Sequence, residues 1–429
     1  MPKIVLVTGA TGYVATRLIP ALLAKGYRVR CLARSPEKLR NRSWLGDVEV
    51  FTGDVLDAES LFPALKDAQA AYYLVHSMAS GGKYREDERL GAKDFGKAAY
   101  ASGLDHIIFL GGLGGSNKDR HMHSRQETGH LLRESGVPVT EFRSSVIIGS
   151  GSISFELIRY LTTWFPIIPA PVRARQPSQP IGIVDLLAYL LMSLENPACR
   201  GEIIEIGGPE IINYPDLMVK FAKEKGFKRS KLWLPAIPNS ISAHVAGLLT
   251  PVPFEIAYPL IEELEAPSVV RQFKGSEKFS RLDSFSTYID SVKFALSRKE
   301  YEPDLPWTAS LVARVPLVKN LIRTVGEGFV IDHRESINSE LSWFAVEMLR
   351  GHIQAGWEID EIGSGSWIRV RKSMGRAGVM YLEVQFSNSR LMQTAFFEPN
   401  GLIGFLWWYC LLPFHSKWLK RMFMKWMVE

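Results

Sequence analysis

The chain has 429 residues, of which 46% are hydrophobic and 22% charged. This balance predicts about two to three folded domains of roughly 100 to 200 residues each and excludes an intrinsically disordered scaffold. The net charge of +6 is compatible with anionic ligands or an anionic membrane surface but does not indicate nucleic acid. Three cysteines without a C-x-x-C spacing indicate neither a disulfide framework nor a zinc site.

The N-terminal residues MPKIVLVTGATG contain an apolar stretch only as long as a strand, and it ends in a glycine turn. A secretory signal would have a longer apolar region, so secretion is not expected. The longest nearly unbroken apolar run, residues 401–414, is shorter than the about 18 to 20 residues of a spanning helix. We therefore expect a cytoplasmic protein, with attachment to a membrane surface left open.

Short apolar strands alternate with helical patterns over the first 150 residues, as in βαβ units that build a parallel sheet. The first strand is followed by a glycine turn and by apolar residues at helical spacing up to Gly26. This order predicts an α/β fold with a Rossmann-type doubly wound parallel sheet. The expected strands are residues 4–7, 27–33, 48–51, 70–75, 106–110, 140–148 and 200–206, and helices are expected at 87–102 and 184–194.

Two later stretches form a smaller substrate-side region of the same domain, at about residues 150–180 and 230–300. Prolines between residues 166 and 180 exclude a regular helix and indicate a loop over a binding cleft. Residues 233–267 are apolar and interrupted by prolines, which predicts short helices. These helices either line an apolar surface or belong to the hydrophobic core. The first domain is thus predicted to span residues 1–300.

The pattern changes near residues 301–307, and a separate α+β domain is predicted for residues 301–429. A helix is expected at residues 339–354, followed by antiparallel strands at 366–370, 379–386 and 391–396. Together with an aromatic-rich terminal helix, this order resembles a helix-grip fold that encloses an apolar ligand. Aromatic residues beside cations in 402–428 have the composition of a helix lying on an anionic bilayer; the alternative is a helix docked on its own sheet.

The strongest local signal is the turn TGATGYVA at residues 8–15, between the first strand and the first helix. Gly9 permits a tight turn, Gly12 lets the backbone approach a pyrophosphate, and small Ala15 allows close packing of helix on sheet. The start of the helix supplies amides to the anion. The turn predicts dinucleotide binding, with a glycine turn that has lost its ligand as the alternative. Its cofactor-binding residues are Gly9, Thr11, Gly12, Tyr13 and Val14.

The end of the second strand favours NADP over NAD. An acidic residue there would bond the ribose hydroxyls of NAD, whereas a basic one accepts the 2′-phosphate of NADP. The sequence has Arg34 at this place, with Lys38 one turn on, and no acid. The alternative is that Arg34 is a solvated loop cation.

The adenine side of the predicted cofactor site follows the third strand. Asp54 is placed to accept from the adenine amino group, or else to cap the helix that opens near Asp57. Val55, Val75 and His76 complete the predicted cofactor-binding residues.

Up to about residue 300, these motifs resemble those of the atypical short-chain dehydrogenase/reductases, close to their NmrA-like and extended groups. TGATGYVA is similar to their glycine loop, GDVLD to their adenine-side motif, and the late segment with GGPE to theirs. The stretches YYLVHSM, SRQETG, TPVPFEIAYPLIEEL and FFEPNGLIGFLWWYCLLPFH resemble a bacterial subgroup that joins an NAD(P)-binding domain to a C-terminal domain of unknown function. The resemblance implies an oxidoreductase.

The catalytic motif of that family is altered. Its Tyr-x-x-x-Lys pair is replaced by His121 at the tyrosine position and Arg125 at the lysine position, and Ser116 lies a few residues beyond the place of the usual catalytic hydroxyl. His121 titrates near neutrality and could act as an acid, while Arg125 could bond a ribose. The candidate catalytic residues are therefore His121, Arg125 and Ser116, and binding of NADP without turnover is the alternative.

No metal site is expected, because His121 and His123 are two residues apart at the start of a helix and no cysteine joins them. Three functions are compatible with these features. The first is an NADP-dependent oxidoreductase acting on a small hydrophobic molecule. The second is a non-catalytic NADP-sensing regulatory protein, and the third a membrane-peripheral protein that handles lipids or quinones through residues 401–429.

Overall fold

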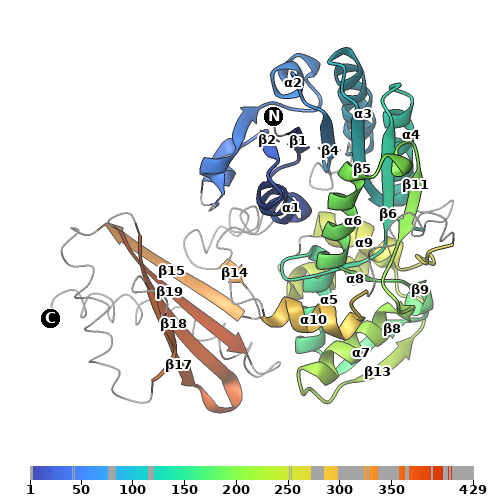
Figure 1. Cartoon of the computed structure of the whole chain (residues 1–429). Helices are drawn as coiled ribbons and strands as arrows, with labels where there is room; N and C mark the ends of the chain where they lie inside the picture. Colours follow the sequence, from blue (N-terminus) through green and yellow to red (C-terminus); the bar gives the residue numbers. More distant parts are fainter. Residues whose placement is uncertain are drawn as a thin grey trace. The chain divides into compact units, whose positions relative to one another are not determined.

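The computed structural model describes residues 3–40, 42, 44–75, 84–114, 120–250, 252, 254–271, 285–297, 323–325, 328–336, 357–362, 367–387, 390–399, 404 and 407. The chain divides into two compact units (Figure 1). One consists of Met1–Thr162 and Ile167–Glu300, the other of Thr163–Pro166 and Tyr301–Glu429.

The first unit is built on a seven-stranded sheet in which all pairings are parallel. The strand order is β11-β6-β5-β4-β1-β2-β3, so the chain builds outward from β1 to β3 and then returns to the centre at β4. This is the predicted Rossmann-type doubly wound sheet, and its strand order reverses between β1 and β4. The strands are β1 (Ile4–Thr8), β2 (Arg28–Ala33), β3 (Glu49–Thr52), β4 (Ala70–Tyr73), β5 (His106–Gly112), β6 (Val139–Ser144) and β11 (Ile203–Ile206).

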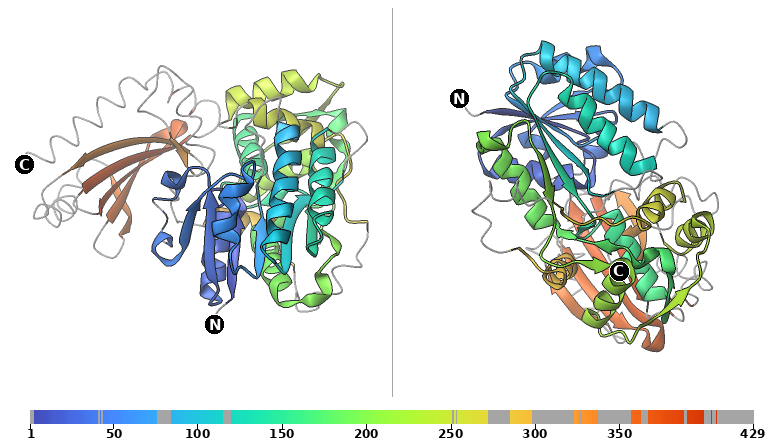
Figure 2. Two further views of the ribbon diagram at one scale, coloured as in Figure 1. Left: turned by 90° about the horizontal axis from the view of Figure 1, so that it is seen from above. Right: turned by 90° about the vertical axis from the view of Figure 1, so that its right-hand side faces the viewer.

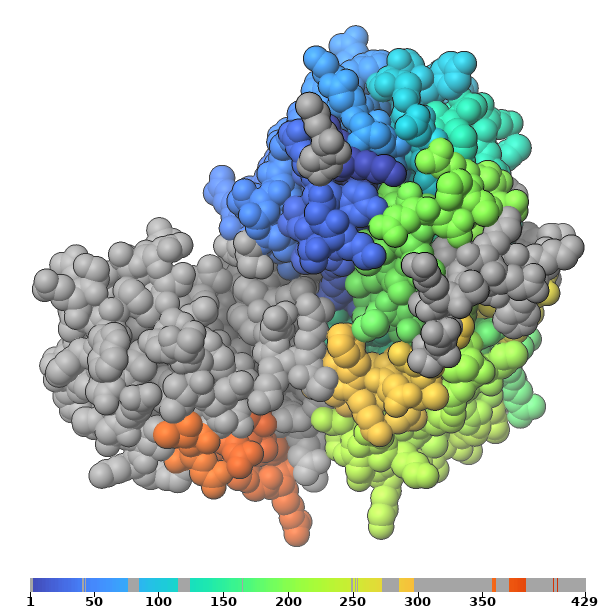
Figure 3. Space-filling view, in the orientation of Figure 1, coloured from blue at the N-terminus to red at the C-terminus, as the bar shows by residue number. Residues whose placement is uncertain are grey.

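Helices cover both faces of the sheet (Figure 2). Val5 and Val7 of β1 pack into an apolar cluster with α1 (Tyr13–Ala24) and α6 (Ile183–Glu195), which lie side by side on the surface in Figure 3. Leu6, between them, packs on the other face against α2 (Ala58–Leu65), α3 (Tyr84–Ala101) and α4 (Arg120–Arg133). Successive residues of a strand point to opposite faces, so a strand buried on both sides is apolar throughout.

The substrate-side region has an apolar cluster of its own, formed by α5 (Ile153–Trp164), α7 (Tyr214–Glu224) and α10 (Tyr288–Ser297). The helices predicted within residues 233–267 are α8 (Asn239–Leu249) and α9 (Phe254–Glu263). Three short strand pairs complete the region: β7 (Ile147–Ile148) with β10 (Ile181–Gly182), β8 (Ile167–Pro171) with β13 (Ser230–Leu234), and β9 (Pro177–Ser178) with β12 (Ile212–Asn213).

Two sequence predictions differ from this arrangement. The proline-rich stretch predicted as a loop contains strand β8, which pairs on one side only, so its prolines need not donate to a second neighbour. The single strand predicted at residues 140–148 is divided into β6 and β7. The division leaves Ser145 and Val146 at the carboxyl end of β6.

The second unit contains a six-stranded antiparallel sheet in the order β14-β15-β19-β18-β17-β16. The strands predicted at residues 366–370, 379–386 and 391–396 correspond to β17, β18 and β19. The helices predicted at residues 339–354 and 402–428 lie outside the described residues, so the helix-grip fold stays a prediction. The strands are β14 (Arg323–Val325), β15 (Gly328–Ser336), β16 (Glu358–Ile362), β17 (Trp367–Ser373), β18 (Gly378–Ser387) and β19 (Arg390–Pro399).

Within the part of the chain that the structure describes, no helix is long and apolar enough to cross a bilayer.

A buried histidine links strands β5 and β6 of the first sheet to the 3-10 turn Pro197–Cys199. His106, at the start of β5, is 1% exposed, and its Nε2 lies 2.8 Å from the Thr140 hydroxyl of β6. That hydroxyl donates its own hydrogen to the Cys199 carbonyl, 2.8 Å away, so His106 Nε2 carries the hydrogen that it donates to Thr140. Burial lowers the pKa of His106 to about 4, and Arg200 adds to the effect.

The free energy of unfolding should therefore depend on pH through His106. Between about pH 6.5 and pH 4 the unfolded chain binds a proton on this residue and the folded chain does not, so stability falls as the pH is lowered. We expect a loss of about 2 kcal/mol between about pH 7 and pH 5 from this residue alone. His106→Gln keeps a donor for Thr140 and should remove this contribution from the pH dependence of the free energy of unfolding. Urea denaturation at a series of pH values measures the change.

The matched control is His130→Gln, since His130 lies on α4 with an exposed side chain. This variant should keep the pH dependence of the unmodified protein. Equal pH dependence in His106→Gln and His130→Gln would show that His106 is not the titrating group.

Candidate functional site

The turn between β1 and α1 lies against the end of β4. Gly9 has a φ of +64°, a conformation that residues with a side chain rarely adopt, and its carbonyl accepts a hydrogen bond from the Gly12 amide at 2.8 Å. A Cβ atom on Gly9 would lie 2.7 Å from the Leu74 carbonyl oxygen, just beyond β4. The fold itself therefore requires glycine at this position.

Gly12 is a different case, because the fold does not require glycine there. Its φ is −76°, and a Cβ atom would meet only the Gly9 carbonyl oxygen, at 3.1 Å. Gly12 is the N-cap of α1, no side chain caps the helix, and its first turn contains no acidic residue. No acidic residue of the first turn competes with a bound anion at the start of α1, and the small residue at position 12 leaves room for a pyrophosphate there.

The other predicted residues of the turn are partly buried around it. Thr11, Tyr13 and Val14 sit at the start of α1. The Arg17 guanidinium lies 4.0 Å from the centre of the Tyr13 ring and donates to the Ser150 carbonyl at 2.7 Å. This contact fixes the start of α1 to the turn that follows β7.

The predicted 2′-phosphate site lies at the carboxyl end of β2. The Arg34 side chain is 63% exposed, and its guanidinium is 3.8 Å from the Asp54 carboxylate. Lys38 is exposed in the 3-10 turn Pro36–Leu39, so both predicted cations are accessible to a ligand.

The structure separates the two roles that the sequence left open for Asp54. Asp57, not Asp54, caps α2 by accepting from the Glu59 amide, while Asp54 accepts from the Leu56 amide at 3.1 Å and so supports the turn after β3. Val55 is 7% exposed and its side chain packs at Gly91 of α3, so only its backbone is suited to contact a cofactor. Val75 is partly buried just after β4, and His76 lies outside the described residues.

Of the three predicted catalytic residues, only Arg125 can be placed in full. Its guanidinium donates to the Leu110 carbonyl of β5, and burial lowers its pKa from the usual range of arginine. His121 lies in the first turn of α4, but its side chain is outside the description, as is Ser116. Buried Ser124, next to Arg125, donates to the Glu88 carboxylate of α3 at 2.7 Å.

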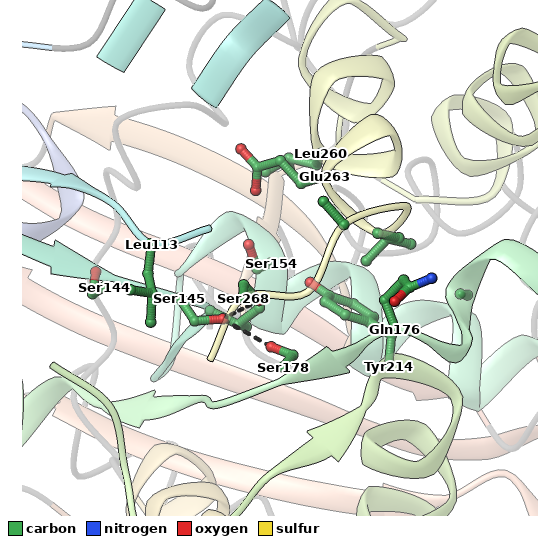
Figure 4. Close-up of a pocket in the computed structure, with 14 residues that line it drawn as sticks. Leu113, Ser144, Ser145, Ser154, Gln176, Ser178, Tyr214, Leu260, Glu263 and Ser268 are labelled. Carbon is green, nitrogen blue, oxygen red and sulfur yellow. Dashed lines mark hydrogen bonds between the residues drawn. The ribbon is translucent and has the colours of Figure 1, made fainter. Parts of the chain in front are cut away.

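A cavity of about 70 Å³ lies at the carboxyl ends of β5 and β6 and beneath α9 (Figure 4). It has an apolar side and a side rich in hydroxyl groups. Its lining consists of Leu113, Ser144, Ser145, Val146, Ser154, Ala174, Gln176, Ser178, Tyr214, Leu260, Glu263, Leu264, Ala266 and Ser268.

Two lining residues, Tyr214 and Glu263, determine the electrostatics of the cavity. Burial raises the pKa of the Tyr214 phenol, an effect that a hydrogen bond with Ser154 partly offsets. The Glu263 carboxylate acts electrostatically on both Tyr214 and Arg125. Through Glu263, the cavity is therefore coupled electrostatically to Arg125, the one predicted catalytic residue that can be placed, although none of its lining residues was singled out from the sequence. The pair Ser144-Ser145 directly after a buried strand was the available signal.

Among the described residues, no group of three or more histidine, cysteine, aspartate or glutamate side chains is placed to hold a metal ion.

Comparison with known proteins identifies the first unit. Residues 9–144 match the NAD(P)H-binding family. The chain is 32% identical over 225 residues to the photosystem II assembly factor Ycf39 of Cyanophora paradoxa, covering 50% of this chain and 66% of that protein. It is 25% identical over 239 residues to the chloroplastic divinyl chlorophyllide a 8-vinyl-reductase of Oryza sativa subsp. indica, covering 48% and 54%. The chain thus spans about half to two thirds of these relatives.

Two solved structures share the fold. One is a nucleoside-diphosphate-sugar epimerase from Staphylococcus aureus, with a TM-score of 0.54, 19% identity and coverage of 68% of this chain and 100% of that one. The other is an NADPH-dependent quinone oxidoreductase from Escherichia coli in complex with NADPH, with a TM-score of 0.54, 17% identity and coverage of 67% and 98%. At such identities they establish the fold alone. Together with the family match over residues 9–144, they show a Rossmann-type domain with an NAD(P)H-binding segment, as its motifs predict.

A Cβ on Gly12 would meet only the Gly9 carbonyl oxygen, so Gly12→Val should abolish dinucleotide binding while leaving the protein folded. The valine would fill the space that the pyrophosphate needs. Its cost to the helix start should be about 1 kcal/mol, since glycine is a better N-cap than valine. Titration calorimetry with NADPH, and the melting temperature without ligand, measure the two effects separately.

The control is Gly46→Val, in the 3-10 turn Leu45–Asp47, where an added Cβ meets no atom within 4 Å. Gly46→Val should bind NADPH like the unmodified protein. Retained affinity in Gly12→Val would mean that the cofactor lies elsewhere.

Proposed function

We propose that the chain is an NADP-dependent oxidoreductase that acts on a small hydrophobic molecule bound beside β5 and β6. One observation carries the proposal. The N-terminus of α1 at Gly12, which can bind an anion, and the accessible cation Arg34 follow two neighbouring strands, β1 and β2. A dinucleotide with a 2′-phosphate presents anionic groups to both places.

The preference for NADP rests on how easily Arg34 can exchange partners. An exposed ion pair such as Arg34 with Asp54 contributes only about 0 to 1 kcal/mol. A 2′-phosphate carries more charge than a carboxylate and offers three acceptor oxygens, so it competes well for the guanidinium. Asp54 is also held in its own turn by the Leu56 amide, so it stays in place when Arg34 turns to a ligand.

The substrate side is supported by the cavity at the carboxyl ends of β5 and β6, whose Glu263 acts electrostatically on Arg125. Leu113, Val146 and Leu260 give it an apolar wall suited to a hydrophobic molecule. Bound NADPH supplies a hydride. His121, one helical turn before Arg125 on α4, is the expected proton donor, and Arg125 holds positive charge at the end of β5.

A second function, binding of NADP without turnover, is favoured by one contact. The Arg125 guanidinium donates to the Leu110 carbonyl and so is partly used within the protein, whereas the lysine it replaces in the family bonds the cofactor ribose. The names of the relatives include both a reductase and an assembly factor, so both classes of function are compatible with this type of domain.

A membrane-peripheral function would depend on residues 401–429 and predicts flotation with anionic liposomes that is lost on their removal. For the oxidoreductase we expect a cytoplasmic location.

Single-turnover measurements separate the oxidoreductase from the sensor. The protein loaded with one equivalent of NADPH is mixed with a panel of aldehydes, ketones, enones and quinones, and NADPH fluorescence and product are followed together. The oxidoreductase consumes NADPH in proportion to product, and His121→Ala loses turnover while keeping affinity for NADPH. Tight binding without consumption by any acceptor supports the sensor.

Arg34→Glu should weaken NADPH binding selectively. Loss of the cation and gain of a like charge should lower affinity for NADPH by about 100-fold, because charge-assisted hydrogen bonds to phosphate contribute about 1.5 to 3 kcal/mol. Affinity for NADH, which has no 2′-phosphate, should change little. Parallel fluorescence titrations with both nucleotides measure the ratio.

Lys25→Glu makes the same change of charge at the far end of α1 and serves as the control. It should leave the NADPH to NADH ratio unaltered. An equal loss for both nucleotides in Arg34→Glu would place the 2′-phosphate away from β2.

A further inference from the structure

We infer that the cavity beside β6 binds the polar end of the substrate and that this end is a neutral, hydroxyl-bearing group. The inference rests on the proposed function for the identity of the bound molecule as a substrate. It narrows the substrate class from a hydrophobic molecule to an amphipathic one whose polar end carries no charge.

Three serine hydroxyls form one wall of the cavity. Ser145 Oγ lies 2.8 Å from both Ser178 Oγ and Ser268 Oγ (Figure 4). Three hydroxyls have three hydrogens, and two of these are used between them. The cluster can therefore donate a hydrogen to a ligand and also offers lone pairs, which is the complement of a hydroxyl or carbonyl group.

The cluster is held in place by backbone contacts. The Ser268 amide donates to the Pro177 carbonyl and the Ser268 carbonyl accepts from the Gln179 amide, each at 2.9 Å. The buried Gln179 side chain in turn bonds the Val270 amide at 3.0 Å and the Gly208 carbonyl at 2.7 Å. The hydroxyls are thus positioned before a ligand arrives, which lowers the entropy cost of binding.

A fourth hydroxyl faces the cluster from a different element. Tyr214 opens α7, and its phenol points into the cavity toward Ser154 and Ser268 (Figure 4). Because burial raises its pKa, the phenol stays protonated and remains a hydrogen-bond donor. A ligand hydroxyl between the serine cluster and Tyr214 can accept a hydrogen bond from the Tyr214 phenol and donate one to a serine oxygen.

The charges of the described residues around the cavity disfavour an ionic ligand end. Among the lining residues that the structure describes, Glu263 is the one charged side chain. Its carboxylate would repel a carboxylate or a phosphate. Arg125, which interacts electrostatically with Glu263, offsets the attraction that an ammonium group would otherwise experience. A buried charge without a partner is costly, so a neutral group is favoured.

The size of the cavity fits one end of a molecule. A volume of about 70 Å³ holds a few water molecules or a group of about five non-hydrogen atoms, well below the roughly 300 to 1,000 Å³ of a site that encloses a whole ligand. Leu113 and Val146 border the same space, so the polar group would be followed by an apolar portion of the molecule.

The test uses three probes of similar size, each with about five or six non-hydrogen atoms. They are 1,2-propanediol, 1-amino-2-propanol and lactate, which all carry a hydroxyl and have a neutral, a cationic and an anionic end respectively. Their binding to the full chain loaded with NADPH is measured by saturation-transfer NMR. We expect the diol to bind with a dissociation constant on the order of millimolar, and the amine and lactate to bind at least about fivefold more weakly.

Two variants test whether the diol binds in this cavity. Ser145→Ala removes the hydroxyl that joins the other two and should weaken diol binding about fivefold or more. Glu263→Gln removes the negative charge and should reduce the discrimination against lactate. Ser230→Ala, at the exposed start of β13, should change neither. Melting temperatures of all variants show that they are folded.

The inference is overturned if the amine or lactate binds as well as the diol, if the diol does not bind at about 100 mM, or if Ser145→Ala binds it unchanged. NADPH affinity is measured on the same samples by fluorescence. Loss of NADPH binding with diol binding intact would contradict the proposed function and leave the polarity of the cavity standing. Loss of diol binding with NADPH bound would contradict this inference alone.

Discussion

The close approach of Gly9 to the end of β4 determines the rest of the site. The strand order reverses between β1 and β4, so the chain leaves these adjacent strands toward opposite faces of the sheet and a crevice opens above them. The Thr8 hydroxyl joins the two strands, donating to the Tyr72 carbonyl and accepting from the Leu74 amide. Only a glycine in a left-handed turn can then pass above Leu74, and this turn directs the start of α1 into the crevice. The ends of β2 and β6 bring Arg34 and Ser145 to the same edge of the sheet, and Arg125 of α4 donates to the Leu110 carbonyl of β5.

The sequence predicted the first sheet because its signals are local. Apolar runs, a glycine turn and helical spacing each lie within one element, and their order determines the sheet. The cavity could not be predicted in the same way. Ser145, Ser178, Tyr214, Glu263 and Ser268 come from five separate segments, and no spacing relates them. The proline-rich segment was wrongly predicted as a loop because proline excludes a helix and a central strand but not a strand such as β8 that pairs on one side.

Helix α4 keeps its place although the catalytic pair of the related family is altered. The Glu141 carboxylate of β6 is fully buried and paired with Arg133 at the end of α4 and with Arg143 of β6. A Cβ on Gly129 would collide with this carboxylate, so the small residue lets α4 lie close to the sheet. Removal of one partner from such a buried group typically costs about 3 to 5 kcal/mol. The polar contacts therefore preserve the position of the helix independently of whether its first turn carries tyrosine or His121.

The dinucleotide end and the cavity end of the site differ in solvent exposure. They therefore differ in how strongly they disfavour a ligand group of the wrong charge. At the dinucleotide end, anionic groups meet backbone amides and an accessible guanidinium, where water limits the cost of an imperfect match. At the cavity end, Ser178 is buried, Ser145 and Ser268 are partly buried, and Glu263 interacts electrostatically with Arg125, so a mismatched charge would have less solvent to stabilise it. Nucleotide preference can therefore change through a single surface cation. A change of substrate polarity would require several buried groups to change together, because each hydroxyl of the cluster has another as its partner.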